Sequence, residues 1–344
     1  MNWPTGHSST SSCGWTRRHS RPSTRPIPCS KNGTTRSTYC GWKRDCRSMS
    51  TEDASTLAEA LGHPQGPDVM DDGTVVFAET YTSRLALCSG DGKLSELHHC
   101  GGGPNAVILG SDNRVYFTQN GGQAGDWRAE TQRPPALEVF DPSTGEAREI
   151  CRAANGRPFL APHDLAWGPD GSLYMTDSGT WAPGGETEPG AIVAVSPDGT
   201  AELVLETGHV FPSGIAVAAD GTIYWAECYT HRIMRLRKGG TPAEVCTLPQ
   251  GHTPESLKID ANGNFWVAAL EAAGFDIVRP NGEIAGFLRT GGLPLNGTLK
   301  DGRLYVADLG PFQEDLPAPQ LIGRLQSVEC GVRPGPTFRS SIEI

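Results

Sequence analysis

Residues 163–177, HDLAWGPDGSLYMTD, decide the fold of this chain. Apolar and polar residues alternate up to a Pro-Asp-Gly turn, and a second alternating run containing Leu, Tyr and Met follows the turn. A period of two is typical of a half-buried strand, and Asp-Gly tolerates the positive φ of a tight hairpin. The stretch therefore predicts a β-hairpin that begins beside a proline, Pro162.

The same hairpin pattern occurs five more times along the chain. The other copies read QGPDVMDDGTVVFAE at 65–79, NAVILGSDNRVYFTQ at 105–119, SGIAVAADGTIYWAE at 213–227, ESLKIDANGNFWVAA at 255–269 and NGTLKDGRLYVAD at 296–308. Successive starts are 40, 58, 50, 42 and 41 residues apart, the period of a propeller blade with two enlarged loops. A second glycine turn follows in five units, at 89–92, 141–145, 196–199, 237–240 and 279–282. The sequence predicts an all-β, six-bladed β-propeller of four-stranded antiparallel blades, with its closing strand near 321–332.

The first 48 residues differ from the rest of the chain. They contain nine Lys or Arg residues, one Asp and no apolar period. We expect a disordered basic extension or translated upstream sequence over 1–48, with a basic targeting arm as the alternative. Residues 49–344 are expected to form a single propeller domain.

The charge of residues 49–344 limits the partners. Of the 29 basic and 39 acidic residues in the chain, 20 and 38 remain there, a formal charge of −18. Nucleic acid is disfavoured by that charge, and no apolar run reaches the roughly 20 residues that span a bilayer. The six cysteines of this part show no CxxC spacing. We expect a soluble, cytoplasmic protein with a small-molecule substrate, and the sequence leaves its oligomeric state open.

A polar residue opens the inner strand of each unit, shortly after a proline. Inner strands surround the axis of a propeller, so these residues should meet at one mouth: Gln65, Asn105, His163, Ser213, Glu255 and Asn296. The second strands end at the same face with residues that either extend this ring or cap loops: Glu79, Gln119, Asp177, Glu227 and Asp308. The enlarged loops 121–135 and 179–190 are expected to overhang the mouth with Trp127 and Trp181, as substrate-binding lids.

The segments GGGPNAVIL, APHDLAWGPDGSLYMTD, FPSGIAVAADGTIYWAE and SLKIDANGNFWVA resemble the gluconolactonase, regucalcin (senescence marker protein) and luciferin-regenerating enzyme family over 62–310. The resemblance implies a six-bladed propeller that holds a divalent metal, usually calcium, on its axis and hydrolyses lactones or related esters. The family's ligand positions, a Glu, two Asn and an Asp, are occupied here by Gln65, His163, Ser213 and Glu255. All four positions therefore depart from the family's pattern.

These departures leave the cofactor open. One carboxylate, an amide, a hydroxyl and an imidazole are a poor set for calcium, whereas the imidazole and carboxylate better suit zinc or another transition metal. Without a metal, His163 and Glu255 could divide general acid and base work, as the metal-independent, related strictosidine synthases suggest by analogy. Gln65, Asn105, Ser213 and Asn296 would then bind substrate oxygens or an oxyanion.

Three functions follow from this ring. The first is a lactonase-like hydrolase, with water activated beside Glu255. The second is a metal-independent lyase, isomerase or cyclase that uses Glu255 and His163, and the third is a non-catalytic, small-molecule-binding propeller. A structural role remains an alternative for His163, Ser213 and Asn105. Walker-type, HExxH and GxSxG motifs are absent from the sequence.

Overall fold

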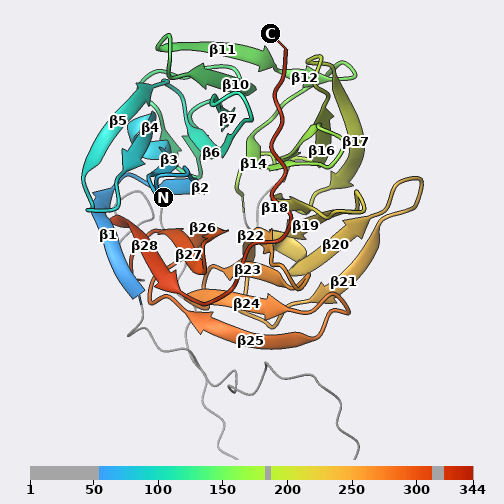
Figure 1. The fold of residues 1–344 in the computed structure, drawn as a ribbon. Coiled ribbons are helices and arrows are strands. Elements are labelled where there is room, and N and C mark those ends of the chain that lie inside the picture. Colours follow the sequence, from blue (N-terminus) through green and yellow to red (C-terminus); the bar gives the residue numbers. More distant parts are fainter. Residues whose placement is uncertain (1–53, 183–186, 312–320, 344) are drawn as a thin grey trace, which may run out of the picture. The chain divides into compact units, whose positions relative to one another are not determined.

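Six four-stranded antiparallel blades surround one axis (Figure 1), and the predicted six-bladed propeller is confirmed. The computed structural model describes residues 54–182, 187–311 and 321–343. The extension expected over 1–48 lies outside these residues, and its disorder stays a prediction.

The strands of each blade follow the chain from the axis outward, except in the last blade. Blade one contains β2 (Pro64–Val69), β3 (Val75–Glu79), β4 (Arg84–Cys88) and β5 (Leu94–His99). Blade two contains β6 (Pro104–Leu109), β7 (Val115–Gln119), β10 (Ala136–Asp141) and β11 (Glu146–Cys151). Blade three contains β14 (Pro162–Trp167), β15 (Leu173–Asp177), β16 (Gly190–Val195) and β17 (Ala201–Gly208). Blade four contains β18 (Pro212–Val217), β19 (Ile223–Glu227), β20 (Arg232–Leu236) and β21 (Ala243–Thr247). Blade five contains β22 (Pro254–Ile259), β23 (Phe265–Ala269), β24 (Gly274–Val278) and β25 (Ile284–Arg289). Blade six contains β26 (Pro294–Lys300), β27 (Arg303–Asp308), β28 (Gly323–Glu329) and β1 (Ala54–Leu61). Short additions are the hairpins β8–β9 (Gln123–Ala124, Trp127–Arg128) and β12–β13 (Ala153–Ala154, Arg157–Pro158), and the 3-10 turns η2 (Thr80–Thr82) and η3 (Cys228–Thr230).

The last blade is closed by the N-terminal strand, which the sequence repeat did not reveal. The strand expected near 321–332 is β28, and β1 pairs antiparallel with its outer edge. Ala58 and Leu61 of β1 pack in one core cluster with Phe77 of blade one and Leu325 of β28. The pairing therefore joins the first described residues to the last blade and closes the ring.

Each inner strand contains an irregularity just after its opening proline. The proline pairs with the end of the second strand, as Pro254 does with Ala269 and Pro294 with Asp308, and the register then shifts. A β-bulge re-aims the residue that it leaves unpaired, and proline suits such a position because it has no N–H to donate. The bulges thus control which side chains open the inner strands at the mouth.

Adjacent blades come very close near the axis. A Cβ added to Gly214 of β18 would lie 2.3 Å from the Leu257 nitrogen of β22, so only glycine fits there. Second-strand hydroxyls also join neighbouring blades: Thr118 Oγ1 donates to the His163 carbonyl at 2.8 Å, and Thr176 Oγ1 donates to the Ser213 carbonyl at 2.6 Å. These bonds fix the backbone of the residues that the sequence assigns to the ring.

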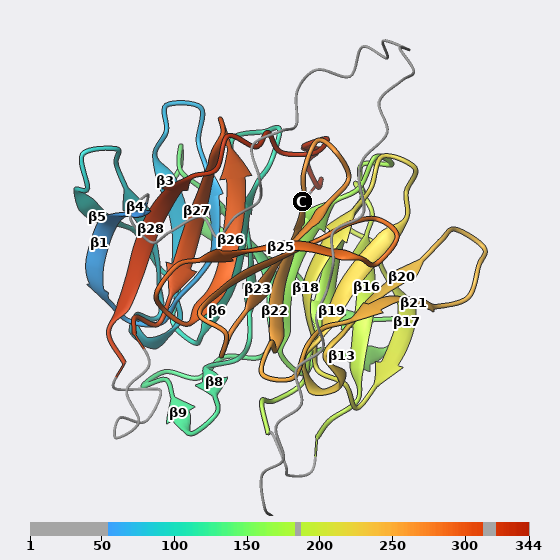
Figure 2. The ribbon, with the colours of Figure 1, turned by 90° about the horizontal axis from the view of Figure 1, so that it is seen from below.

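The segment 331–343 crosses the face that carries the Asp-Gly turns, opposite the mouth (Figures 1 and 2). It is hydrogen-bonded at both ends, from Gly335 N to the Ile259 carbonyl and from Ile342 N to the Tyr116 hydroxyl, and Ile342 is buried in the core. Beneath it lies a cavity of about 660 Å³ lined by residues of all six inner strands. The segment therefore covers the axial channel on this side.

Among the described residues, no helix is long and apolar enough to cross a membrane. The six cysteines within these ranges are free thiols. Cytoplasmic localisation, expected from the sequence, stays a prediction.

The pairing of β1 with the last blade is expected to be a main contribution to stability. We predict that Leu61→Ala lowers the free energy of unfolding by about 2–4 kcal/mol, because a buried leucine leaves a cavity between the first and last blades. The matched exposed change in the same strand, Glu59→Ala, should stay within about 0.5 kcal/mol of the parent. Urea unfolding of the three proteins checks this, and equal effects of the two substitutions would contradict it.

Candidate functional site

The six polar residues predicted to form a ring are all buried near the axis. None is more than 7% exposed: Gln65, Asn105, His163, Ser213, Glu255 and Asn296. Each inner strand contacts the next, and β26 contacts β2, so the ring of strands is closed. Buried polar groups need partners, so their hydrogen bonds show what each residue can do.

Two of the six meet directly across the axis. His163 Nε2 lies 3.3 Å from Glu255 Oε1, although the two residues belong to blades three and five. Both side chains are 8% exposed. An imidazole and a carboxylate in contact at a buried position can exchange a proton, which is the arrangement of a general acid–base pair.

A cysteine that sequence reasoning missed holds the other carboxylate oxygen. Cys228 Sγ lies 3.0 Å from Glu255 Oε2 and 2.9 Å from the Pro254 carbonyl oxygen, both of them acceptors. Burial, followed by the charge of Glu255, raises the pKa of the Cys228 thiol well above its ordinary value. The thiol therefore stays protonated and acts as a donor that positions Glu255 rather than as a nucleophile.

Ser213 and Asn296 are engaged by the scaffold. The Ser213 hydroxyl is fully buried and donates to the Pro254 carbonyl at 2.9 Å. Asn296 Oδ1 accepts from Ser256 Oγ and from Gly297 N, each at 2.8 Å. The bulge residue of blade six, at the position that Glu255 takes in blade five, is Leu295. Asn296 is therefore one residue beyond the position of Glu255, an offset that the alignment of the shorter hairpin of blade six did not show.

Gln65 and Asn105 retain free amides. Within the ranges that the structure describes, neither side chain has a hydrogen-bond partner, and they are 2% and 5% exposed. Amide N–H groups at the same mouth as the His163–Glu255 pair are suited to binding a substrate oxygen.

His63 is a second member of the site that sequence reasoning missed. Its Nδ1 atom and that of His163 are buried and have no hydrogen-bond partner among the described residues. Burial lowers the pKa of His63 to about 4, with Glu255 opposing the shift and His163 adding to it. His63 is therefore neutral at pH 7. The sequence does place His63 directly before Pro64, the proline that opens the inner strand of blade one. The equivalent residue of blade four is Phe211.

The two lid tryptophans lie among aromatic rings at the mouth. The Trp127 ring is 4.9 Å from Tyr81, and the Trp181 ring is 4.9 Å from Phe211, which in turn lies 5.6 Å from His163. The loops that carry the tryptophans meet through a 2.8 Å hydrogen bond from Gln123 Nε2 to Thr180 Oγ1. The β8–β9 hairpin of the first loop projects from the face opposite the 331–343 segment (Figure 2).

The residues that end the second strands hold loops together. Glu79, Asp177, Glu227 and Asp308 pair with Arg84, Arg157, Arg232 and Arg324, and Gln119 bonds the backbone of Gly101 and Gly103. Of the two predicted alternatives, this geometry favours loop capping.

The donor set does not fit the calcium ion that the resemblance implies. Calcium takes six to eight oxygens, with carboxylates supplying the charge. Glu255 is the one carboxylate among the four expected ligands, and its oxygens face an imidazole and a thiol. The Ser213 hydroxyl already donates a hydrogen bond to the Pro254 carbonyl. Among the described residues, no group of three His, Cys, Asp or Glu side chains is arranged to hold a metal.

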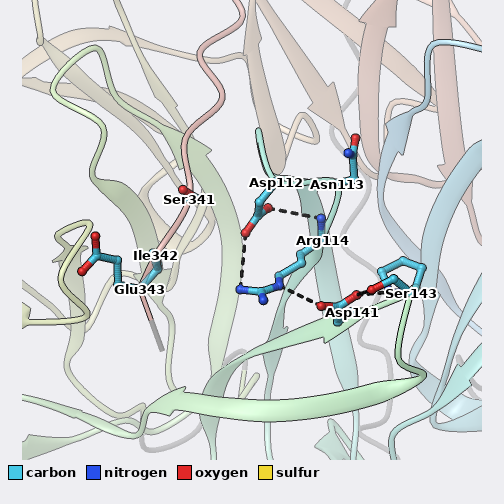
Figure 3. Close-up of a pocket in the computed structure, with 9 residues that line it drawn as sticks. Asp112, Asn113, Arg114, Asp141, Ser143, Ser341, Ile342 and Glu343 are labelled. Carbon is cyan, nitrogen blue, oxygen red and sulfur yellow. Dashed lines mark hydrogen bonds and ion pairs between the residues drawn. The ribbon is translucent and has the colours of Figure 1, made fainter.

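A separate surface groove lies beside blade two and the end of the 331–343 segment (Figure 3). Arg114 of this groove is paired, because it lies between Asp112 and Asp141. The groove contains none of the ring residues.

The SMP-30/Gluconolactonase/LRE-like region matches residues 63–307. A gluconolactonase of Zymomonas mobilis is 24% identical over 211 residues, which are 54% of this chain and 54% of that protein. The chain thus spans about half the length of this relative.

Solved structures share the fold. Regucalcin from Agrobacterium tumefaciens, a calcium-binding protein, superposes with a TM-score of 0.66 at 19% identity, covering 83% of this chain and 95% of that chain. A luciferin-regenerating enzyme superposes with a TM-score of 0.67 at 16% identity, covering 84% of this chain and 99% of that chain. At these identities the likeness concerns the propeller itself.

We predict that His63 makes stability depend on pH. Its pKa is about 4 in the fold and 6.5 as a free side chain, so its contribution is complete above pH 6.5 and falls as pH drops towards 4. His63→Gln should remove about 1–3 kcal/mol of the difference in unfolding free energy between pH 7 and pH 4. The exposed His99→Gln is the control. Denaturant unfolding at several pH values checks this, and parallel curves for both variants would refute it.

Proposed function

Since the chain belongs to the SMP-30/Gluconolactonase/LRE-like family, we propose that it is a hydrolase that opens a lactone or related ester at the His163–Glu255 pair. The observation that carries this proposal is the 3.3 Å contact between the two side chains at the mouth. The relationship to a gluconolactonase supports the reaction class.

Glu255 is the proposed general base. It removes a proton from water, whose oxygen attacks the substrate carbonyl carbon. Cys228 holds the carboxylate through Oε2, which leaves Oε1 beside His163 Nε2. The base is thus held by one donor, Cys228 of blade four, and contacted by His163 of blade three.

His163 is the proposed acid. As the C–O bond of the ester breaks, the leaving alkoxide takes a proton from the imidazole, and the imidazole recovers it from the carboxyl group that it contacts. One proton passes through the pair, and the products are an acid and an alcohol. The amides of Gln65 and Asn105 donate to the oxyanion that forms between attack and departure.

This mechanism uses no metal step. The acid–base pair also suits a lyase, isomerase or cyclase, because proton transfer to and from carbon needs the same two groups. The family relationship to a gluconolactonase supports hydrolysis as the first candidate among these reactions.

We expect Glu255→Gln to lower kcat/KM for δ-lactone hydrolysis by about 10³-fold, because the amide cannot accept the proton of water. His163→Asn should lower it by about 10²-fold. The exposed β17 change Glu202→Gln is the matched control and should keep the activity of the parent. Thermal unfolding of each variant separates lost chemistry from lost structure. Full activity of a folded Glu255→Gln protein would overturn the assignment.

Hydrolysis is also expected to survive metal removal. After dialysis against EDTA, kcat/KM should stay within about twofold of the untreated protein. The reason is that the ring offers one carboxylate rather than the several oxygen ligands that calcium requires. A loss of activity that calcium or zinc restores would show that a metal takes part.

A further inference from the structure

Two short segments on opposite sides of the propeller have the same local structure. The sequence ETYTSR at 79–84 and the sequence ECYTHR at 227–232 each leave the second strand through a 3-10 turn that ends in a left-handed residue. In each, the initial glutamate pairs with the final arginine at 2.9 Å. Blades one and four, which carry these turns, are three blades apart and so face each other across the axis.

Each turn presents a tyrosine to two further rings. On one side, Tyr81 lies 4.5 Å from His63 and 4.9 Å from Trp127, and we call these three rings the first aromatic wall. On the other side, Tyr229 lies 5.5 Å from Phe211 and 5.2 Å from Trp181, which form the second aromatic wall. Each wall thus joins a turn, a residue that precedes an inner strand and an enlarged loop.

The walls are held in an unusual backbone conformation. His63 and Phe211 both have positive φ, 60° and 51°, although each is a bulky residue directly before a proline. Such a conformation costs of order 1–3 kcal/mol and persists where the surroundings require it, commonly at ligand sites. The loops add rigidity, since Ala182 N donates to the Tyr229 hydroxyl at 2.8 Å.

Both walls border the acid–base pair. The Phe211 ring of the second wall meets His163 edge-on at 5.6 Å. His63 of the first wall is close enough to the pair for the charges of Glu255 and His163 to act on its imidazole. A group bound between the walls would therefore hold its carbonyl close to Glu255.

Most arginines near the walls are paired with acids, and Arg128, exposed beside Trp127, bonds the carbonyls of its own hairpin. Arg84 and Arg232, beside the two turns, are both engaged by buried glutamates. Arg157 of β13 and Arg324 of β28 are engaged by the buried aspartates that end two other second strands. None of these four cations is available to anchor a carboxylate or phosphate.

We propose that the two aromatic walls bind a planar, uncharged aromatic ring fused or attached to the substrate's lactone or ester, so that aryl lactones and esters, rather than free sugar lactones, are the substrate class. This inference rests on the proposed hydrolysis. Offset or edge-to-face contacts between aromatic rings stabilise such a complex.

Kinetics on a matched pair of δ-lactones test the walls. Isochroman-3-one carries a fused benzene ring and δ-valerolactone does not, while both release an alkyl alcohol. We expect a KM at least 10-fold lower for isochroman-3-one. Trp127→Ala and Trp181→Ala should each reduce this KM ratio about 3- to 10-fold, Trp181→Phe should largely restore it, and the exposed Ile284→Ala should leave it unchanged. Equal KM values for the two lactones in the parent protein would overturn the proposal.

A binding measurement separates this proposal from the proposed reaction. Calorimetry of isochroman-3-one with the Glu255→Gln protein should show binding that weakens when Trp181→Ala is added. If neither lactone is hydrolysed but this binding pattern is found, the aromatic site stands and the hydrolase assignment falls. If δ-valerolactone is hydrolysed and isochroman-3-one does not bind, the hydrolase stands and the aromatic site falls.

Discussion

Six inner strands share one axis, and the burial of polar side chains on them is the constraint on which the site depends. An unpaired buried polar group costs of order 1–3 kcal/mol, and a buried charge costs more. Ser213 and Asn296 meet this demand through bonds to the neighbouring blade, so they stabilise the ring. Glu255 meets it through Cys228 and contacts His163, whose Nδ1 has no partner among the described residues, so a pair of titratable groups lies in contact at the mouth.

Two terminal segments maintain the ring that this contact requires. β1 pairs with β28 and so joins the first and last blades, while the segment 331–343 covers the opposite end of the axial channel. Under that segment Lys258 Nζ lies 2.9 Å from Asp164 Oδ2, a second contact between blades three and five. Lys258 is close in sequence to Glu255, and Asp164 is next to His163. The Lys258–Asp164 and His163–Glu255 contacts therefore join blades three and five at two levels along the axis.

The repeat made the fold and the meeting of His163 with Glu255 predictable, because a period of about 40 residues and one proline per unit place equivalent residues on one axis. The strand β1 was not predictable in this way, since it belongs to no copy of the hairpin. The one-residue offset in blade six was also not predictable. Its shorter hairpin aligns Asn296 with Glu255, whereas the residue at the bulge of β26 is Leu295. Cys228 contacts Glu255 of the neighbouring blade, and His63 is affected by the charges of Glu255 and His163 on blades five and three. A pattern within single blades carries no information on such relations between blades.

The departures from the family's calcium ligands have a physical explanation in the same contacts. Several carboxylates cannot be buried together near an axis without a cation, because their mutual repulsion adds to the cost of desolvation. Here the expected ligand positions hold a single carboxylate, whose Oε2 accepts from a protonated thiol and whose Oε1 lies 3.3 Å from an imidazole nitrogen. The Glu255 carboxylate therefore has contacts to both of its oxygens within the protein, which is consistent with its proposed role as a base.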